Sequence, residues 1–221
     1  MTEAVVNALT ALVAPDAELV RHLGDGDEVT ARIVAAAYEQ MAVVGWRRCT
    51  MDDVARRARL GRATVYRKFP TRQALLDAVV LAEVRKYLAD STAAVSAQPT
   101  VADRIAESAA HTMEFLRGHR VLRRLLETEP ESVLPALTTH SGPLLDLVRE
   151  FCVAVWRREL AGDTPISEER EQHLRTVAEL HIRITLSFIL GEHTSIPLDT
   201  AEQAREFART YLAPMLLDGR W

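Results

Sequence analysis

Residues 50–69 constrain the fold most, because they have the pattern of two short helices joined by a sharp turn. Thr50 can cap the first helix, with Asp53 three residues later completing the contacts to free backbone N–H groups. Helical spacing then places four apolar side chains on one face: Met51, Val54, Ala55 and Ala58. Gly61 interrupts this pattern, and Pro70 ends the second helix because proline has no N–H to donate. Two short helices joined in this way are typical of a helix-turn-helix.

Basic side chains are concentrated in the same segment. Between Arg47 and Arg72, nine basic residues accompany two acidic ones, a local charge of +7, although the whole chain carries −4. In a helix-turn-helix the second helix enters the major groove, so it needs side chains that meet phosphates and base edges. Side chains of this kind are Arg62, Thr64, Tyr66, Arg67 and Lys68. The charge segregation predicts a nucleic-acid-binding face on an otherwise acidic protein.

The residues of this segment resemble the TetR family of transcriptional regulators. The shared pattern begins with the end of a first helix (Gly45, Trp46), a threonine that caps the next helix (Thr50) and an apolar-alanine pair (Val54, Ala55). It continues with a Thr-x-Tyr-x-x-Phe recognition helix (Thr64, Tyr66, Phe69) and a basic residue before two leucines (Arg72, Leu75, Leu76). The close resemblance covers residues 28–76. It implies an all-α fold, in which an N-terminal three-helix helix-turn-helix domain is followed by a helical ligand-binding and dimerisation domain.

Three positions depart from the family pattern. Arg59 stands where the turn usually carries glycine, Gly61 where serine or threonine usually caps the second helix, and Lys68 where histidine is common. We expect Arg59 to adopt a positive φ at a cost of about 1 kcal/mol. Because Gly61 is a weaker cap than serine, we expect a slightly altered turn on an intact fold.

The resemblance also implies a function, that of a ligand-released repressor that binds a palindromic DNA operator as a homodimer. Two recognition helices would then lie about 34 Å apart on the duplex. We expect phosphate contacts from Thr50, Tyr66, Lys68 and Arg72, and base-edge contacts from Arg62, Ala63, Thr64 and Arg67. Two alternatives stay open: a constitutive DNA-binding protein without an effector, and a ligand-binding or interaction module that has lost operator use. The sequence does not separate a repressor from an activator.

The resemblance, together with composition and periodicity, predicts three regions in the chain. Residues 1–27 form an N-terminal extension with a short helix over 3–13, residues 28–74 the DNA-binding domain, and residues 75–221 the helical effector-binding and dimerisation domain. Apolar residues recur at three and four positions, which predicts helices over 30–44, from 71 or 72 to 96, and over 101–118, 120–129, 131–138, 142–161, 167–191 and 200–217. Strand-like alternation is absent.

The two longest helices of the second domain are the candidate dimer elements. Each has one apolar face, which from the pattern alone could equally be internal core. The resemblance implies that they pair with their copies as a four-helix bundle. The candidate interface residues are Leu144, Leu147, Val148, Phe151 and Val155 on the first helix, and Leu174, Val177, Leu180, Ile184 and Phe188 on the second.

The resemblance further implies an effector pocket in the second domain. Most of the candidate wall residues are expected to be ordinary core: Met113, Phe115, Leu116, Leu122, Leu126, Leu137, Phe151, Trp156, Ile182 and Phe188. His111, His181 and Arg183 lie on apolar helices, where a polar group needs a partner. We expect a small lipophilic effector, such as an acyl chain or a steroid-like or drug-like molecule.

The sequence gives little support to an enzyme. It contains no His-Glu-x-x-His spacing, no Gly-x-Ser-x-Gly elbow and no glycine-rich phosphate loop, so we expect no catalytic residues, no cofactor and no metal. Cys49 and Cys152 are far apart and suggest neither a disulfide framework nor a zinc site. No apolar run is long enough to cross a membrane, and no signal peptide is evident, so we expect a cytoplasmic protein without a membrane partner.

Overall fold

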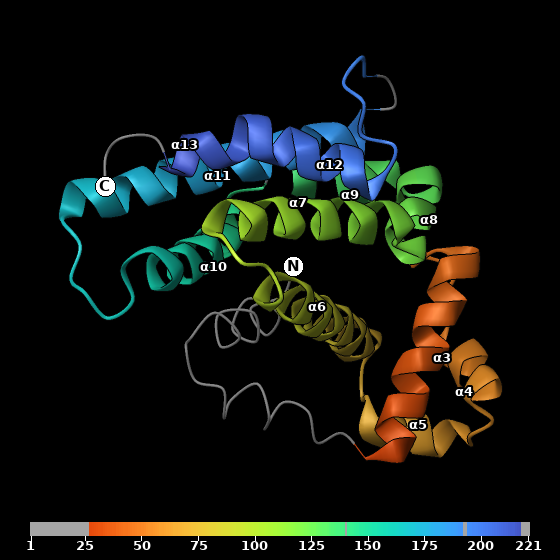
Figure 1. Ribbon diagram of the computed structural model, residues 1–221. Helices are drawn as coiled ribbons and strands as arrows, with labels where there is room; N and C mark the ends of the chain where they lie inside the picture. Colours follow the sequence, from red (N-terminus) through yellow and green to blue (C-terminus); the bar gives the residue numbers. More distant parts are fainter. Residues whose placement is uncertain (1–26, 140, 192–193, 218–221) are drawn as a thin grey trace. The chain divides into compact units, whose positions relative to one another are not determined.

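The computed structural model describes residues 27–139, 141–191 and 194–217. Its helices are α3 (Glu28–Val44), α4 (Met51–Ala58), α5 (Arg62–Lys68), α6 (Arg72–Ser96), α7 (Val101–Gly118), α8 (Arg120–Thr128), α9 (Pro130–Leu137), α10 (Gly142–Ala161), α11 (Glu168–Leu190), α12 (Ala201–Phe207), the π-helical turn η1 (Ala208–Leu212) and α13 (Ala213–Leu217) (Figure 1). Strands are absent from these residues, and the all-α class and domain order are confirmed. The short helix predicted over 3–13 lies outside the described residues.

Local capping chemistry explains where helices α3 and α12 begin and how α3 ends. The first DNA-binding helix, α3, begins two residues before the predicted Thr30, because Asp27 caps it by accepting a hydrogen bond from the Thr30 amide at 2.8 Å. Gly45 follows α3 with a φ of 80°, a backbone conformation that side chains with a Cβ rarely adopt. Helix α12 begins with a complete capping box between Thr200 and Gln203.

The chain packs into two compact units. Of the described residues, unit 1 holds 27–86 and 119–139, and unit 2 holds 87–118 and 141–217. Helices α8 and α9 therefore belong to the unit that contains the helix-turn-helix. The domain limits expected at residues 27/28 and 74/75 concern function and stay a prediction.

The core of unit 1 joins α3, α4, α5, the start of α6 and α8. Ile33, Val54 and Val65 have no exposed surface, and Leu75 is 1% exposed. Val121 of α8 packs in the same cluster. Since α3, α4 and α5 each contribute buried side chains, the apolar face predicted for the first helix of the motif does pack against neighbouring helices.

The core of unit 2 is built from α7, α10, α11 and the C-terminal helices. Its buried side chains include Ile105, Val153, Leu174, Val177 and Leu216. The guanidinium of Arg205 reaches across from α12 to the Glu107 carboxylate of α7, with Nε 2.7 Å from Oε2, and this pairing lowers the pKa of Glu107. The ion pair ties α12 to α7 along the edge of the apolar core.

Pro214 does not break the last helix, which was predicted over residues 200–217. Proline has no N–H, so the usual bond to the carbonyl four residues earlier cannot form. The preceding turn widens instead: the Ala213 amide donates to the Ala208 carbonyl, five residues back, and residues 208–212 form a π-helical turn. The chain therefore stays helical from Ala201 to Leu217, and its Ala208 and Leu212 side chains remain buried in unit 2.

Candidate nucleic-acid interface and apolar cavity

The turn between α4 and α5 has the geometry that the sequence predicted. Thr50 Oγ1 accepts a hydrogen bond from the Asp53 amide at 3.1 Å and donates one to the Asp53 carboxylate at 2.6 Å. Arg59 ends α4 in the left-handed region, with φ 54° and ψ 45°, and Gly61 precedes α5 without a side-chain cap. The expected positive φ of Arg59 is thus confirmed, and α4 and α5 form an intact helix-turn-helix.

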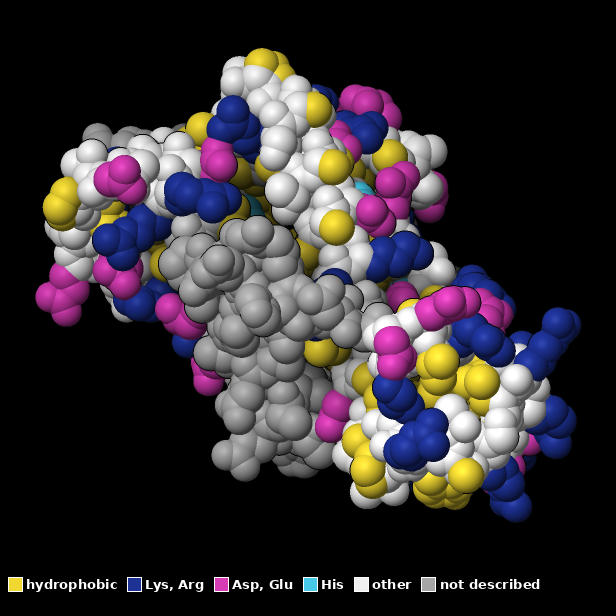
Figure 2. Space-filling model, turned by 90° about the horizontal axis from the view of Figure 1, so that it is seen from below, with side chains coloured by type: hydrophobic (Ala, Val, Ile, Leu, Met, Phe, Trp, Pro, Cys, Tyr) yellow, Lys and Arg dark blue, Asp and Glu magenta, His cyan; other side chains and the backbone are white. Residues whose placement is uncertain are grey.

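Helix α5 is anchored by one side and exposed on the other. Val65 is completely buried and Phe69, just after the helix, is 7% exposed. Arg62, Ala63, Tyr66, Arg67 and Lys68 are exposed, and Thr64 is half-buried. Figure 2 shows dark blue Lys and Arg side chains bordering the face of unit 1 that is turned to the viewer. The exposed side of α5 therefore carries the side chains predicted to meet DNA.

Two of the exposed basic side chains are paired within the protein. Arg62 bonds the carboxylate of Asp52 on α4, and Lys68 Nζ lies 2.5 Å from Asp27 Oδ2, just before α3. The bond from Lys68, followed by bonds from Thr30, lowers the pKa of Asp27 to about 2. Asp27 and Asp52 therefore offset two of the positive charges on the helix-turn-helix surface at neutral pH.

Arg72 is held more firmly than the other predicted phosphate ligands. Its guanidinium lies 4.0 Å from the centroid of the Trp46 ring and donates a hydrogen bond to the Trp46 carbonyl. The side chain is half-buried. A stacked and bonded guanidinium has little freedom, so Arg72 fixes the turn between α3 and α4 in this structure.

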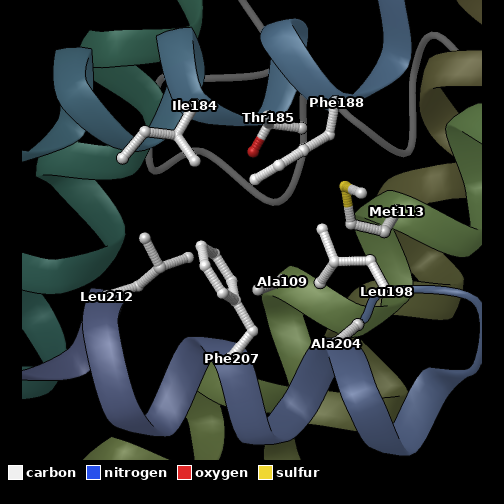
Figure 3. A pocket seen from close by; sticks show the side chains of 9 residues that line it. All are labelled: Ala109, Met113, Ile184, Thr185, Phe188, Leu198, Ala204, Phe207 and Leu212. Carbon is white, nitrogen blue, oxygen red and sulfur yellow. The ribbon is translucent and has the colours of Figure 1, made fainter. Parts of the chain in front are cut away.

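A small apolar cavity of about 10 Å³ lies inside unit 2. Figure 3 shows side chains from α7, α11, α12 and η1 pointing toward a common space. The lining residues are Ala109, Met113, Ile184, Thr185, Phe188, Leu198, Ala204, Phe207 and Leu212. Met113 and Ala204 also line an open cleft of about 460 Å³, which has Glu114, Arg117, Asp199 and Thr200 around it. The small cavity has room for about one water molecule, and an effector larger than that would have to widen it.

The cavity includes only part of the predicted pocket wall. Met113 and Phe188 line it, whereas Leu122 and Leu126 lie on α8 and belong to unit 1. Leu116 and Phe151 are half-buried in unit 2, and Leu137 ends α9 in unit 1. The contribution of α12 and η1 was not predicted. The apolar spacing of Ala204, Phe207, Ala208 and Leu212 is the signal in the sequence that could have indicated it.

The polar candidates of the pocket have different surroundings. His181 donates from Nε2 to the Leu212 carbonyl at 3.1 Å and meets Trp156 edge-on, and burial lowers its pKa to about 4. The His111 ring lies 5.6 Å from that of Tyr87, and its Nε2 has no hydrogen-bond partner among the described residues. The Phe115 ring contacts the same tyrosine at 5.0 Å. Arg183 is exposed and pairs with Glu179 at 2.7 Å, while Ile182 is half-buried.

The candidate dimer residues also divide into groups. Leu174 and Val177 are buried in the core of unit 2, and Ile184 and Phe188 line the cavity. Leu180 is 41% exposed, whereas Val148, Phe151 and Val155 are half-buried. The side chains of Leu144 and Leu147 are not among those that the structure describes. The surface of α11 that is open to a partner is therefore narrower than the predicted apolar face.

The described residues contain no group of three His, Cys, Asp or Glu side chains that could hold a metal ion. Cys49 and Cys152 are free thiols, and burial raises their pKa values to about 11 and about 12. Both thiols are therefore protonated at neutral pH. Within the same part of the chain, no helix is both long and apolar enough to cross a membrane.

These features define a DNA-binding protein of the helix-turn-helix class, with a separate helical unit on the same chain. Residues 33–79 match the family of bacterial regulatory proteins described as the tetR family. The helix-turn-helix domain is therefore of the TetR type, and the chain is a DNA-binding transcriptional regulator rather than an enzyme. No curated protein matches its sequence.

Two solved structures resemble the chain over most of its length. One is the TetR family repressor AlkX from Dietzia sp., described as implicated in biodegradation of n-alkanes; it has 24% identity and a TM-score of 0.57, with 84% of this chain and 96% of AlkX covered. The other is a TetR-like transcriptional regulator from Rhodococcus sp., with 12% identity and a TM-score of 0.48, covering 86% of this chain and 97% of that one. The likeness to AlkX shows the fold.

Proposed function

We propose that this regulator represses transcription by binding a palindromic operator as a homodimer, and that a small apolar effector releases it. The observation that carries the proposal is the combination of an exposed basic recognition helix in unit 1 with an apolar cavity in unit 2 of the same chain. A ligand can change DNA affinity only if it binds the DNA-competent and the DNA-incompetent states differently. By linkage, the operator then weakens effector binding by the same factor.

The exposed side of α5 supports the contacts proposed with DNA. Arg62, Ala63, Thr64 and Arg67 lie where base edges would be met, and an arginine there favours guanine. Tyr66 and Lys68 are exposed beside them and suit phosphate contacts. Thr50 and Arg72 are hydrogen-bonded within the protein, and Arg62 and Lys68 are paired with Asp52 and Asp27, so contacts of these four residues with DNA would have to form alongside or in place of their present bonds.

The dimer is proposed to form through α10 and α11. Leu180 supports this, because a leucine that is 41% exposed on a long helix can bury more apolar surface against a second copy. Leu180→Asp is expected to shift the protein toward the monomer in sedimentation experiments. Leu134→Asp is the matched control, since Leu134 is 39% exposed on α9 in unit 1. A dimer as strong in Leu180→Asp as in the wild type would contradict this interface.

An apolar effector is supported by the cavity lining, in which Thr185 is the one polar side chain among the nine residues. The repressor AlkX is implicated in biodegradation of n-alkanes, which favours an apolar molecule here as well. A melting-temperature screen against long-chain fatty acids, alkanes and steroids tests this idea, because a ligand that binds the folded state raises the melting temperature. Ala109→Leu, which narrows the cavity, should reduce the shift, whereas Arg183→Gln at an exposed position should not.

The decisive experiment is footprinting of the DNA that flanks the gene for this protein, at two salt concentrations. We expect a protected palindrome and an affinity that falls steeply with salt, because phosphate contacts release counterions. Addition of a compound from the screen should then remove the protection. If the DNA stays protected after addition of each compound that binds the protein, the constitutive DNA-binding alternative is favoured.

A further inference from the structure

Glu129 is a buried carboxylate that lies against the DNA-binding helices. The residue is 3% exposed, and its Oε1 accepts a hydrogen bond from the backbone amide of Arg47 at 2.8 Å. Arg47 lies in the turn between α3 and α4, more than eighty residues away in the sequence. A buried carboxylate is costly unless hydrogen bonds compensate it, so the position of this group suggests a specific role.

The backbone of Glu129 is fixed by the helices on both sides of it. Its amide donates to the Leu125 carbonyl of α8 at 2.8 Å, and its carbonyl accepts from the Ser132 amide of α9 at 2.9 Å. The residue ends α8 and begins α9 at the same time. Because the side chain extends from a backbone held at two helix ends, the junction of α8 and α9 determines where the carboxylate lies.

The turn that receives this carboxylate has little room to adapt. A Cβ added at Gly45 would lie 2.6 Å from Glu129 Oε1 and 2.9 Å from Thr128 Oγ1, so only glycine allows the close approach. The same turn is also held by Arg72, which donates a hydrogen bond to the Trp46 carbonyl. The turn then leads directly to Thr50, the cap of α4. Its position therefore determines where the helix-turn-helix begins relative to α3.

We propose that Glu129 is a positioning residue for specific DNA binding, which holds the α3–α4 turn so that α4 and α5 present their side chains in the geometry that an operator requires. It touches no DNA itself and acts through the Arg47 amide. The inference rests on the DNA binding of the family and does not depend on an effector or on repression.

A positioning role differs from a general structural role in its effect on two kinds of DNA. Non-specific binding depends mainly on positive charge near phosphates, whereas specific binding also needs base-edge contacts in register. Loss of the Glu129 carboxylate should therefore weaken binding to the operator much more than binding to unrelated DNA. Loss of folded protein would weaken both equally.

The experiment uses full-length protein and two duplexes of equal length. One is the sequence that the wild type selects from a random library, and the other is the same sequence scrambled. Fluorescence anisotropy gives both affinities for the wild type, Glu129→Ala, Glu129→Gln and Glu131→Gln. Glu131 is the matched control, because its carboxylate pairs with the exposed side chain of the same Arg47, at 2.5 Å, and exposed pairs of this kind contribute little.

We expect Glu129→Ala to lower the ratio of selected to scrambled affinity by about tenfold, with the scrambled affinity unchanged. Glu129→Gln keeps an acceptor oxygen and should retain the ratio within about threefold, and Glu131→Gln within about twofold. An unchanged ratio in Glu129→Ala, or an equal loss on both duplexes, would overturn the proposal.

Hydrogen exchange of the Arg47 amide gives a second measurement that does not need a well-behaved alanine variant. In the wild type this amide should exchange more slowly than in Glu129→Ala or, if that variant does not fold, in Glu129→Leu. Glu129→Gln should exchange at nearly the wild-type rate. An Arg47 amide that exchanges at the unprotected rate in the folded wild type would show that the carboxylate does not hold the turn, and the proposal would fail.

Discussion

Asp27→Asn is expected to increase both the DNA affinity of this protein and the dependence of that affinity on salt. Asp27 pairs with Lys68 on the exposed side of the recognition helix, so the carboxylate offsets a charge that could otherwise meet a phosphate. Asparagine removes the negative charge but still caps a helix well, and α3 should therefore keep its start at Glu28. The substitution thus separates the two roles of Asp27.

The size of the effect follows from counterion release. One additional phosphate contact steepens the log–log dependence of affinity on salt by about 0.9. Between 50 and 200 mM salt, affinity should then fall by about 3.5-fold more than in the wild type for one protomer, and about 12-fold more for a dimer. Anisotropy titrations with a single duplex across that range measure the slope directly.

Glu28→Gln is the matched control for Asp27→Asn. Glu28 is adjacent, exposed and acidic, and it lies in the first turn of the same helix. If the control steepens the salt dependence as much as Asp27→Asn does, the effect comes from the net charge of the unit, and the argument from the Lys68 pair is wrong. An unchanged slope in Asp27→Asn would refute it as well.

Three further predictions concern single side chains. Tyr66 is 47% exposed, so Tyr66→Ala should lower operator affinity in a gel-shift titration while the dimer and the melting temperature stay unchanged; equal binding would remove Tyr66 from the contact set. Arg59→Gly should stabilise unit 1 by about 0.5–1 kcal/mol in urea unfolding, because glycine tolerates the positive φ of the turn, and destabilisation would contradict this. Burial lowers the pKa of His181 to about 4 from 6.5, so the unfolded chain binds more protons between these values, and stability should fall by up to about 3 kcal/mol as the pH drops from 6.5 to 4. His181→Gln should show a smaller loss over that window, and an equal loss would assign the pH dependence to other groups.

Local patterns made the helix-turn-helix predictable. The Thr50 cap, the left-handed Arg59 and the uncapped Gly61 all depend on residues within a few positions, where backbone sterics and hydrogen bonding act over short range. The bounds of α7 and α10 agree with the predicted ranges for the same reason, since apolar periodicity and flanking glycine or proline mark a helix without reference to its neighbours.

Contacts between distant segments were not predictable from those patterns. The apolar stripe of α11 gave no indication of which side would face the core, and the structure places Leu174 and Val177 inside unit 2 while Leu180 stays exposed. The cavity likewise needed the packing of α12 and η1 against α7 and α11. The sequence pattern shows that one face of a helix is apolar. Only the neighbouring helices determine what covers that face.

The sequence by itself determined the class of this protein, because the helix-turn-helix depends on caps, turn residues and charge that lie within about twenty-five consecutive positions. Only the tertiary structure decided which charges are free and which are paired. Asp27 forms an ion pair with Lys68, and the Arg72 guanidinium stacks on the Trp46 ring. Glu129 accepts a hydrogen bond from the Arg47 amide, which is more than eighty residues away in the sequence. The physical reason is that hydrogen bonds and ion pairs form only at short distances, and the packing of helices that are distant in the sequence brings these partners together.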